Sequence, residues 1–320
     1  MLIHLLAIAG GFLVLAWSAD RFVLGASAVA QHLGVPPLII GLTVVGIGTS
    51  APEMLVSALS AWQGSPGIAV GNAIGSNITN TGLILGATAL AYPLLVRSRI
   101  LRRELPVLLL IMAASLMTVL DGALSALEGG ALLAGMGGLL VWLYLQGRGD
   151  GGDPITAEFA QEIPHDLPLK HALGWLALGM VLLLASSRLL VWAAVALATE
   201  LGVPELVIGL TIVALGTSLP ELAASMAAAR KGEHDIAIGN VIGSNMFNLL
   251  GVMGLAALIA PHAVDAEVLS RDFPVMAGLT VAFLIMGFGR RAHGAITRPE
   301  GLLLVAAYLA YMALLYLQST

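Results

Sequence analysis

The sequence contains no cysteine and few charged residues. Without cysteine, the chain forms no disulfide bonds and holds no metal through a thiolate sulfur. Only 10% of the 320 residues are charged, whereas a soluble domain of this size carries roughly a quarter. So little charge cannot cover a surface that faces water. This composition excludes an ordinary soluble globular protein.

Long apolar runs fill the chain instead. Hydrophobic residues make up 58% of it, and the mean hydropathy is +0.96. With their flanks the runs each reach about 17–25 residues, enough to cross a hydrocarbon core of about 30 Å. The plainest are Met1–Trp17, Leu105–Leu120, Ala131–Leu145, Ala172–Leu184, Phe273–Phe288 and Gly301–Leu317. The first run lacks the basic start and the cleavage site of a signal peptide, so we expect it to span a membrane as well.

The chain is an internal repeat. Residues 41–53 (GLTVVGIGTSAPE) match residues 209–221 (GLTIVALGTSLPE), and residues 71–80 (GNAIGSNITN) match residues 239–248 (GNVIGSNMFN). The offset is 168 residues throughout, as from Glu53 to Glu221. An ungapped match of this length does not arise by chance, so the two halves are copies of one unit.

Each copy is predicted to contain five membrane-spanning helices, which makes the fold an all-α polytopic membrane protein with ten. In the first copy, residues 1–146, they lie near 2–32, 37–62, 67–92, 104–120 and 125–146. In the second copy, residues 170–320, they lie near 170–200, 205–230, 235–260, 272–288 and 299–317. Residues 147–169 between the copies are polar and rich in glycine and proline, which predicts a cytoplasmic linker. Because each copy has an odd number of spans, the two repeats have inverted topology.

The positions of the basic residues orient this arrangement. Of the 14 lysines and arginines, all but Arg188 and Arg271 fall on one side of the predicted membrane. That side holds Arg21, Arg97, Arg99, Arg102, Arg103, Arg148, Lys170, Arg230, Lys231, Arg290, Arg291 and Arg298. Cytoplasmic loops carry an excess of basic residues. We therefore expect a protein of the cell's inner (plasma) membrane with both termini on the extracytoplasmic side.

Two glutamates stand at equivalent places in the predicted membrane segments. Glu53 and Glu221 each follow a proline in the repeated motif. An ionised side chain at mid-bilayer is costly, so it should face a cavity and meet a partner. Neither segment core contains a lysine or arginine, so a bound cation is the simplest partner. A protonated glutamate bonded between helices is the alternative, but it does not explain why both copies keep the surrounding motif.

The surroundings of the two glutamates are rich in oxygen. The residues concerned are Thr49, Ser50, Thr217 and Ser218 within about one turn, and Ser76, Asn77, Asn80, Ser244, Asn245 and Asn248 on the next segments. Pro52 and Pro220 remove backbone donors, so we expect unpartnered carbonyls near Gly46, Gly48, Ala214 and Gly216. Such hard ligands suit Na⁺ and Ca²⁺ rather than soft metals. Two carboxylates balance the charge of one Ca²⁺.

The paired Gly-Thr-Ser-x-Pro-Glu and Gly-Asn-x-Ile-Gly-Ser-Asn elements resemble the prokaryotic sodium/calcium exchangers of the calcium/cation antiporter superfamily. The resemblance covers nearly the whole chain and implies four ion sites between the second, third, seventh and eighth helices. It implies that the calcium ligands are Glu53, Glu221, Thr49 and Thr217. The sodium ligands it implies are Ser50, Ser218, Ser76, Ser244 and the carbonyls of Gly46 and Ala214. It also implies that the long first and sixth helices slide to alternate access.

The sequence departs from some relatives at one position. Asn248, equivalent to Asn80, stands where those relatives carry aspartate. Asparagine keeps an oxygen ligand but cannot titrate, so both residues are candidate ligands without adding charge. This weakens the case for a potassium dependence that relies on the aspartate.

The hypothesis is secondary active antiport of Na⁺ against Ca²⁺ at one shared mid-membrane site. H⁺/Ca²⁺ antiport in the same fold is the nearest alternative, and a passive channel is another. An intramembrane hydrolase with Ser50 or Ser218 as nucleophile lacks a base at suitable spacing, so we expect no enzyme and no cofactor. The expected partners are the two cations and the lipid bilayer, with no nucleic acid.

Overall fold

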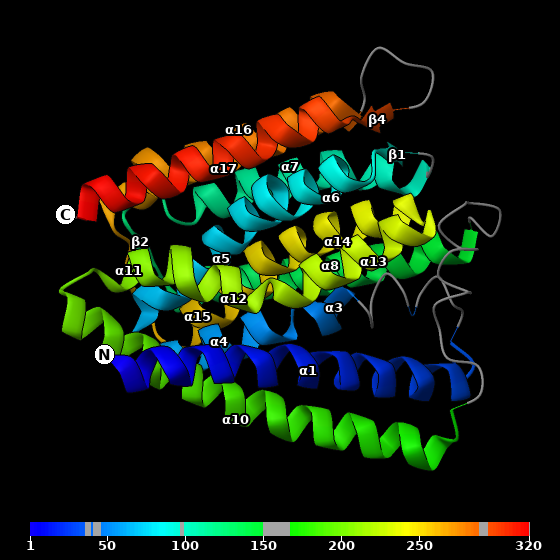
Figure 1. Cartoon of the computed structure of the whole chain (residues 1–320), viewed down its shortest axis with the longest axis horizontal. Coiled ribbons are helices and arrows are strands. Elements are labelled where there is room, and N and C mark those ends of the chain that lie inside the picture. The colour runs from blue at the N-terminus through cyan, green and yellow to red at the C-terminus, as the bar shows by residue number, and fades with distance from the viewer. Residues whose placement is uncertain (36–39, 41–45, 97–98, 150–166, 288–293, 320) are drawn as a thin grey trace.

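Helices follow one another through almost the whole chain (Figure 1). The computed structural model describes residues 1–35, 40, 46–96, 99–149, 167–287 and 294–319. In the first half the elements are α1 (Leu2–His32), α3 (Gly46–Thr49), α4 (Ala51–Trp62), α5 (Pro66–Ile78), the π-helical η2 (Thr79–Leu85), α6 (Gly86–Ala91), β1 (Leu94–Val96), α7 (Arg99–Met117), β2 (Ala123–Leu124) and α8 (Ala126–Gly149).

The second half follows a similar order. Its elements are α10 (Leu169–Leu201), α11 (Glu205–Ile208), η3 (Gly209–Val213), α12 (Ala214–Thr217), α13 (Leu219–Lys231), α14 (His234–Phe247), η4 (Asn248–Val252), α15 (Met253–Ile259), β3 (His262–Ala263), η5 (Val268–Asp272), α16 (Phe273–Gly287), β4 (Gly294–Ile296) and α17 (Arg298–Ser319). The start of the predicted segment 37–62, most of the linker 147–169, and residue 288 of the segment 272–288 lie outside the described residues.

Six described helical segments are long and apolar enough to cross a membrane: α1, α8, α10, α14 to α15, η5 to α16, and α17. A seventh is added if α11 to α12 and α13, which meet at a bend of 42°, form one span. The segment from α5 to α6 is less apolar because polar residues such as Asn72, Ser76 and Asn80 lie along it. Helix α7 starts five residues before the predicted 104 and contains Pro106 in its interior. Four charged residues, Arg99, Arg102, Arg103 and Glu104, precede its apolar part.

The two longest helices, α1 and α10, lie side by side along one edge of the molecule (Figure 1). They approach closely because each presents a glycine to the other: a Cβ at Gly25 would meet the backbone of Leu176, and one at Gly179 would meet the backbone of Phe22. The Arg21 guanidinium also lies 5.1 Å from the ring centroid of Trp175 on α10. The two glycine contacts and this cation–π contact hold α1 against α10.

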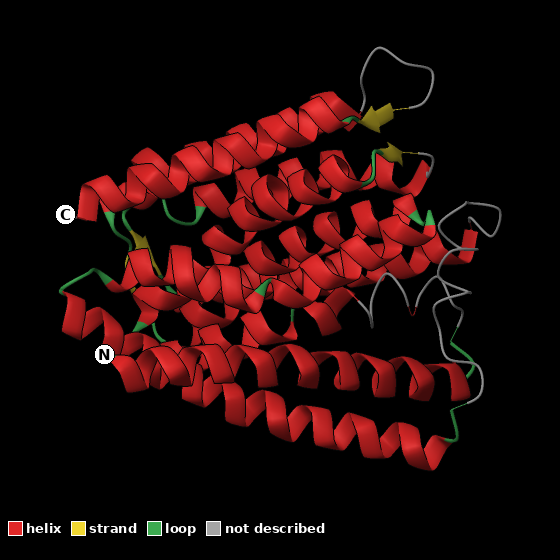
Figure 2. Cartoon of the chain, viewed as in Figure 1, coloured by secondary structure: helices red, strands yellow, loops and turns green. Residues whose placement is uncertain are grey.

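Two short antiparallel ribbons lie at opposite ends of the molecule, and both termini lie at the end that holds β2 (Figure 2). Strand β1 pairs with β4, and β2 pairs with β3, so each ribbon joins the first half of the chain to the second. These strands depart from the all-helical expectation. They are loop segments of two or three residues, too short to be read from an alternating pattern.

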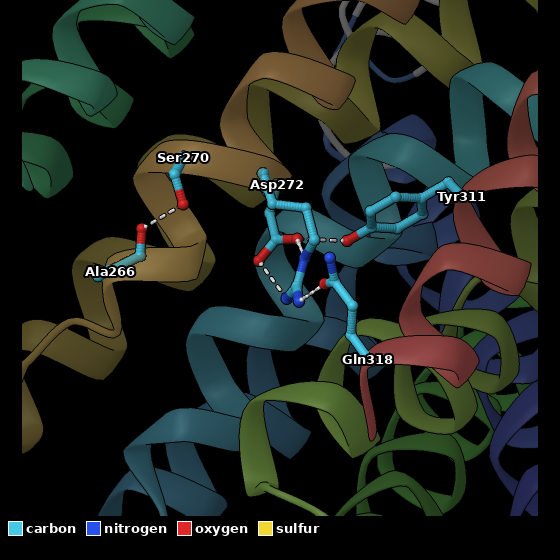
Figure 3. A network of polar contacts seen from close by, with 6 residues as sticks. Ala266, Ser270, Asp272, Tyr311 and Gln318 are labelled. Atoms are coloured by element: carbon cyan, nitrogen blue, oxygen red, sulfur yellow. Dashed lines mark hydrogen bonds and ion pairs between the residues drawn. The ribbon is translucent and has the colours of Figure 1, made fainter. Parts of the chain in front are cut away.

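A buried polar cluster ties η5 to α17 at the end that holds the termini (Figure 3). Arg271 donates to both carboxylate oxygens of the fully buried Asp272, from Nε at 2.6 Å and from Nη2 at 3.1 Å. The Tyr311 hydroxyl donates to the same carboxylate at 2.8 Å, and Arg271 Nη1 donates to Gln318 Oε1 at 2.8 Å. The acid is thus buried with a cation and a hydroxyl as partners.

Candidate cation-binding site

Both repeated motifs break their helices at the same serine. Helix α3 ends at Thr49 and α4 begins at Ala51, with Ser50 between them at φ −83° and ψ 1°. In the second copy Ser218 separates α12 from α13 at φ −85° and ψ 7°. A proline follows two residues after each break and opens the next helix. Each glutamate therefore lies in the first turn of a new helix that starts inside the apolar body of the protein.

The backbone around the breaks corrects part of the sequence expectation. The carbonyl of Gly46 accepts a hydrogen bond from Ser50 N at 3.4 Å, and that of Ala214 accepts one from Ser218 N at 3.1 Å. These two carbonyls are therefore not left without partners. The prolines remove the donors for the carbonyls four residues earlier, at Gly48 and Gly216. The Gly46 and Ala214 oxygens can still face a cation, since a carbonyl has a second lone pair.

The two glutamates are fully buried, with 0% exposure for each side chain. Ser218 Oγ donates to Glu53 Oε1 at 3.0 Å, and this bond crosses from the second copy to the first. Ser244 Oγ donates to Glu221 Oε1 at 3.3 Å within the second copy. Because Ser218 and Glu221 are one helical turn apart, Glu53 lies beside the start of α13.

Several of the predicted ligand atoms have no hydrogen-bond partner within the described part of the chain. They are Ser50 Oγ, Glu53 Oε2, Asn80 Oδ1, Glu221 Oε2 and both side-chain polar atoms of Asn248. Buried polar atoms are normally paired, because an unpaired one costs about 1–3 kcal/mol. Five unpaired oxygens on these motifs match the donor set of a hard cation. Where the structure is described, no group of three or more His, Asp or Glu side chains is placed to hold a metal.

The second motif of each copy brings amide side chains together between the halves. Asn80 Nδ2 donates to Asn245 Oδ1 at 3.2 Å, and Asn245 Nδ2 donates to Thr81 Oγ1 at 2.9 Å. Asn77 instead donates to the Ala73 carbonyl of its own helix at 2.8 Å. Asn77 and its counterpart Asn245 thus have different partners, because residue 249, the counterpart of Thr81, is a leucine with no hydroxyl.

Two asparagines that the sequence reasoning did not single out connect the predicted ligands. Asn72 accepts from Ser76 Oγ at 3.3 Å and from Thr217 Oγ1 at 3.0 Å. Asn240, its counterpart, accepts from Thr49 Oγ1 at 3.3 Å. Both stand in the repeated Gly-Asn pair, so identity between the copies was the available signal. A polar residue that both copies keep within a membrane segment is a candidate for a role at the site.

Known proteins are similar to this chain in sequence and in fold. A sequence model of the family described as "Sodium/calcium exchanger protein" matches residues 3–145 and 171–317. CaxA of Alkalimonas amylolytica is 47% identical over 99% of both chains. The inner membrane protein YrbG of Escherichia coli (strain K12) is 42% identical over 96% of this chain and 94% of its own. A structure of the sodium-calcium exchanger NCX_Mj soaked with Na⁺ and Sr²⁺ is 32% identical over 98% of each chain, with a TM-score of 0.69. The chain belongs to the sodium/calcium exchanger family of membrane transporters.

Proposed function

We propose that the protein is a secondary active antiporter that exchanges Na⁺ for Ca²⁺ at one site shared by the two ions. The observation that carries the proposal is the pair of fully buried glutamates, Glu53 and Glu221, each with one carboxylate oxygen that has no partner among the described residues. The similarity to the sodium-calcium exchanger NCX_Mj over 98% of the chain supports the choice of ions.

The proposed calcium ligands are the two glutamates with Thr49 and Thr217. Their combined charge of −2 balances one Ca²⁺, which lowers the cost of holding the ion in a medium of low dielectric constant. The proposed sodium ligands are hydroxyl and carbonyl oxygens that flank this centre, with Asn80 and Asn248 as neutral amide ligands. They are Ser50, Ser218, Ser76, Ser244, Gly46 and Ala214.

The proposed topology has ten membrane spans in two inverted repeats, residues 1–146 and 170–320, joined by a cytoplasmic linker at 147–169. Two observations support it. Both termini lie at the same end of the molecule, as an even number of spans requires (Figure 1). The ribbons β1–β4 and β2–β3 lie at opposite ends and each joins the two halves, as a twofold relation in the membrane plane would produce (Figure 2). We place the protein in the inner membrane with both termini outside the cytoplasm.

Coupling follows from charge. An empty site leaves two carboxylates without counter-charge in the protein interior, which disfavours the change of access unless cations are bound. We propose that α1 and α10 move as one pair against the helices that carry the site, because their close glycine contacts hold them together.

Flux into proteoliposomes tests the proposal. Vesicles loaded with Na⁺ and diluted into Na⁺-free buffer containing ⁴⁵Ca²⁺ should accumulate calcium, whereas vesicles with equal Na⁺ on both sides should not. Parallel vesicles carry a K⁺ gradient or a pH gradient in place of the Na⁺ gradient. Uptake driven by the pH gradient alone would assign the protein to H⁺/Ca²⁺ antiport. Calcium entry that needs no counter-ion would make it a channel.

A further inference from the structure

Asn72 and Asn240 hold equivalent positions one turn before Ser76 and Ser244 on the helices that face the two glutamates. The Asn72 side chain is buried, and that of Asn240 is partly buried. Asn72 Nδ2 donates to the Glu53 carbonyl at 3.3 Å and to Ser57 Oγ at 2.9 Å. Each asparagine thus uses its nitrogen to hold the glutamate-bearing helix of its own half.

The second copy makes the same bonds at nearly the same distances. Asn240 Nδ2 donates to the Glu221 carbonyl at 3.2 Å and to Ser225 Oγ at 2.9 Å. With the nitrogen held by two acceptors, the amide orientation is fixed by the network, and the oxygen must point the other way.

The oxygen of each asparagine reaches across to the opposite half. Thr217 Oγ1 lies 3.0 Å from Asn72 Oδ1, and Thr49 Oγ1 lies 3.3 Å from Asn240 Oδ1. Each asparagine therefore connects the glutamate of one half with the threonine of the other.

The threonine hydroxyls have other acceptors within reach. Thr217 Oγ1 lies 3.0 Å from the Val213 carbonyl and 3.4 Å from the Ala214 carbonyl, and Thr49 Oγ1 lies 3.2 Å from the Gly46 carbonyl. A hydroxyl carries a single proton, so it donates to one acceptor at a time. Threonine in a helix often donates to the backbone. If Thr217 donates to Ala214, or Thr49 to Gly46, the hydroxyl occupies a carbonyl that we propose as a sodium ligand.

We propose that Asn72 and Asn240 are positioning residues that accept the hydroxyl protons of Thr217 and Thr49. The inference rests on the proposed function. It assigns the asparagines no contact with the ion. Their oxygens turn the threonine lone pairs toward the cation and leave the second lone pair of the Ala214 and Gly46 carbonyls available to it. The geometry of each half therefore depends on a residue of the other.

The amide is the side chain that this role requires. Aspartate would keep the acceptor but lose the donor to the glutamate carbonyl and add negative charge, and leucine would lose both. Residues that orient metal ligands typically contribute about 10–100-fold to metal affinity. We expect Asn72→Leu and Asn240→Leu to raise the KM for Ca²⁺ by about that factor, with a smaller change in the maximal rate.

Double-mutant cycles between the halves test the assignment. Thr217→Val replaces the hydroxyl with a methyl group of similar size. In the Asn72→Leu background it should raise KM by a smaller factor than in the wild type, because the positioning of the hydroxyl is already lost, whereas Thr49→Val should have its full effect there. In the Asn240→Leu background the expectation is reversed: Thr49→Val should raise KM by the smaller factor, and Thr217→Val should have its full effect.

Two further variants separate the ends of the amide. Asn72→Asp keeps the oxygen that accepts from Thr217, so Thr217→Val should retain most of its wild-type effect in that background. Ser57→Ala removes one of the two acceptors of the Asn72 nitrogen and should raise the KM less than Asn72→Leu does, because the Glu53 carbonyl still accepts from that nitrogen. Calcium-dependent stabilisation against thermal unfolding in detergent gives a second readout, which needs no transport and applies to variants that reconstitute poorly.

The outcomes separate this inference from the function on which it rests. A wild-type protein that neither transports nor is stabilised by Ca²⁺ would overturn the proposed function. A wild-type protein that does both, with Thr217→Val and Thr49→Val equally additive in the Asn72→Leu background, would overturn the positioning role alone. If Asn72→Leu lowers the unfolding temperature but leaves the KM unchanged, Asn72 has a structural role and no positioning role.

Discussion

The Ser218 hydroxyl donates a hydrogen bond of 3.0 Å to a carboxylate oxygen of Glu53, although the two residues are 165 positions apart in the chain. The equivalent bond in the other direction is not made, since Ser50 Oγ has no partner among the described residues. The repeated motif is symmetric in sequence, but its side chains are not symmetric in this state of the protein. This asymmetry agrees with the proposed inverted repeats, because two such halves adopt different conformations in turn.

Ser218→Ala should weaken the response to Na⁺ more than the response to Ca²⁺, because we propose this hydroxyl as a sodium ligand. A hydrogen bond to a charged group is worth about 1.5–3 kcal/mol, so the Na⁺ concentration for half-maximal exchange should rise by about tenfold or more. The measurement is ⁴⁵Ca²⁺ uptake at varied internal Na⁺. Ser60→Ala is the matched control, since Ser60 is buried nearby and bonds to the Ser57 carbonyl of its own helix at 3.0 Å. An equal shift in both variants would remove Ser218 from the site.

Glu53→Gln and Glu221→Gln should each reduce Ca²⁺ uptake by at least about 100-fold, because removing one partner of a buried charge pair costs about 3–5 kcal/mol. The amide keeps the size of the side chain, so folding should be preserved, and size-exclusion profiles in detergent check this. Glu128→Gln provides the control. That residue caps the start of α8, where it accepts from Ser125 N at 2.8 Å, and a glutamine oxygen can accept the same bond. Wild-type uptake by Glu53→Gln or by Glu221→Gln would contradict the proposed site.

The mostly helical fold and the position of its described helices could be predicted from the sequence because two simple signals agree. Apolar length located the segments, and the constant 168-residue offset cross-checked each against its copy. The breaks at Ser50 and Ser218 were foreseeable from the prolines, since proline removes a specific backbone bond. The start of α7 was placed too late because charged residues at a membrane boundary hide a helix end that hydropathy alone cannot locate.

The finer parts of the site could not be read in the same way. Which serine bonds to which glutamate depends on how the halves pack, and no local pattern encodes that contact. The roles of Asn72 and Asn240 were missed for the same reason, because their bonds join helices 145 and 191 residues apart in the chain. The partners of the Gly46 and Ala214 carbonyls were misjudged because proline frees the carbonyl four residues earlier, which belongs to Gly48 or Gly216.

Gly216 cannot carry a side chain while Phe12 holds its present position, because a Cβ on this glycine would overlap the Phe12 ring. Gly216→Ala should therefore push α1 away from α12, at a cost of about 1–3 kcal/mol, and slow exchange. Phe12→Ala makes room, so the double variant should recover a large part of the activity lost in Gly216→Ala. Gly138→Ala is the control, since a Cβ there meets nothing within 4 Å. Failure of Phe12→Ala to rescue Gly216→Ala would show that another contact excludes the methyl group.

Tyr311→Phe should destabilise the protein without changing the KM for either ion. The variant removes the 2.8 Å bond to the buried Asp272 carboxylate, and a bond to a charged group contributes about 1.5–3 kcal/mol. Thermal unfolding in detergent measures the loss, with Tyr92→Phe at an exposed position as the control. An unchanged unfolding temperature would mean that Arg271 alone satisfies the acid.

The proposed orientation in the membrane can be tested on a clean background, because the chain has no cysteine of its own. Asp265→Cys introduces a thiol in the turn between β3 and η5, at the end of the molecule that holds the termini. Glu162→Cys introduces one in the linker 147–169. A maleimide that cannot cross membranes should label the first variant in intact spheroplasts and the second only after permeabilisation. The reverse pattern would invert the protein in the membrane, with the basic loops outside. The proposed topology places an odd number of spans between residues 162 and 265, on opposite sides of the membrane. Labelling of both variants in intact spheroplasts would place them on the same side, which requires an even number, and would overturn the ten-span topology.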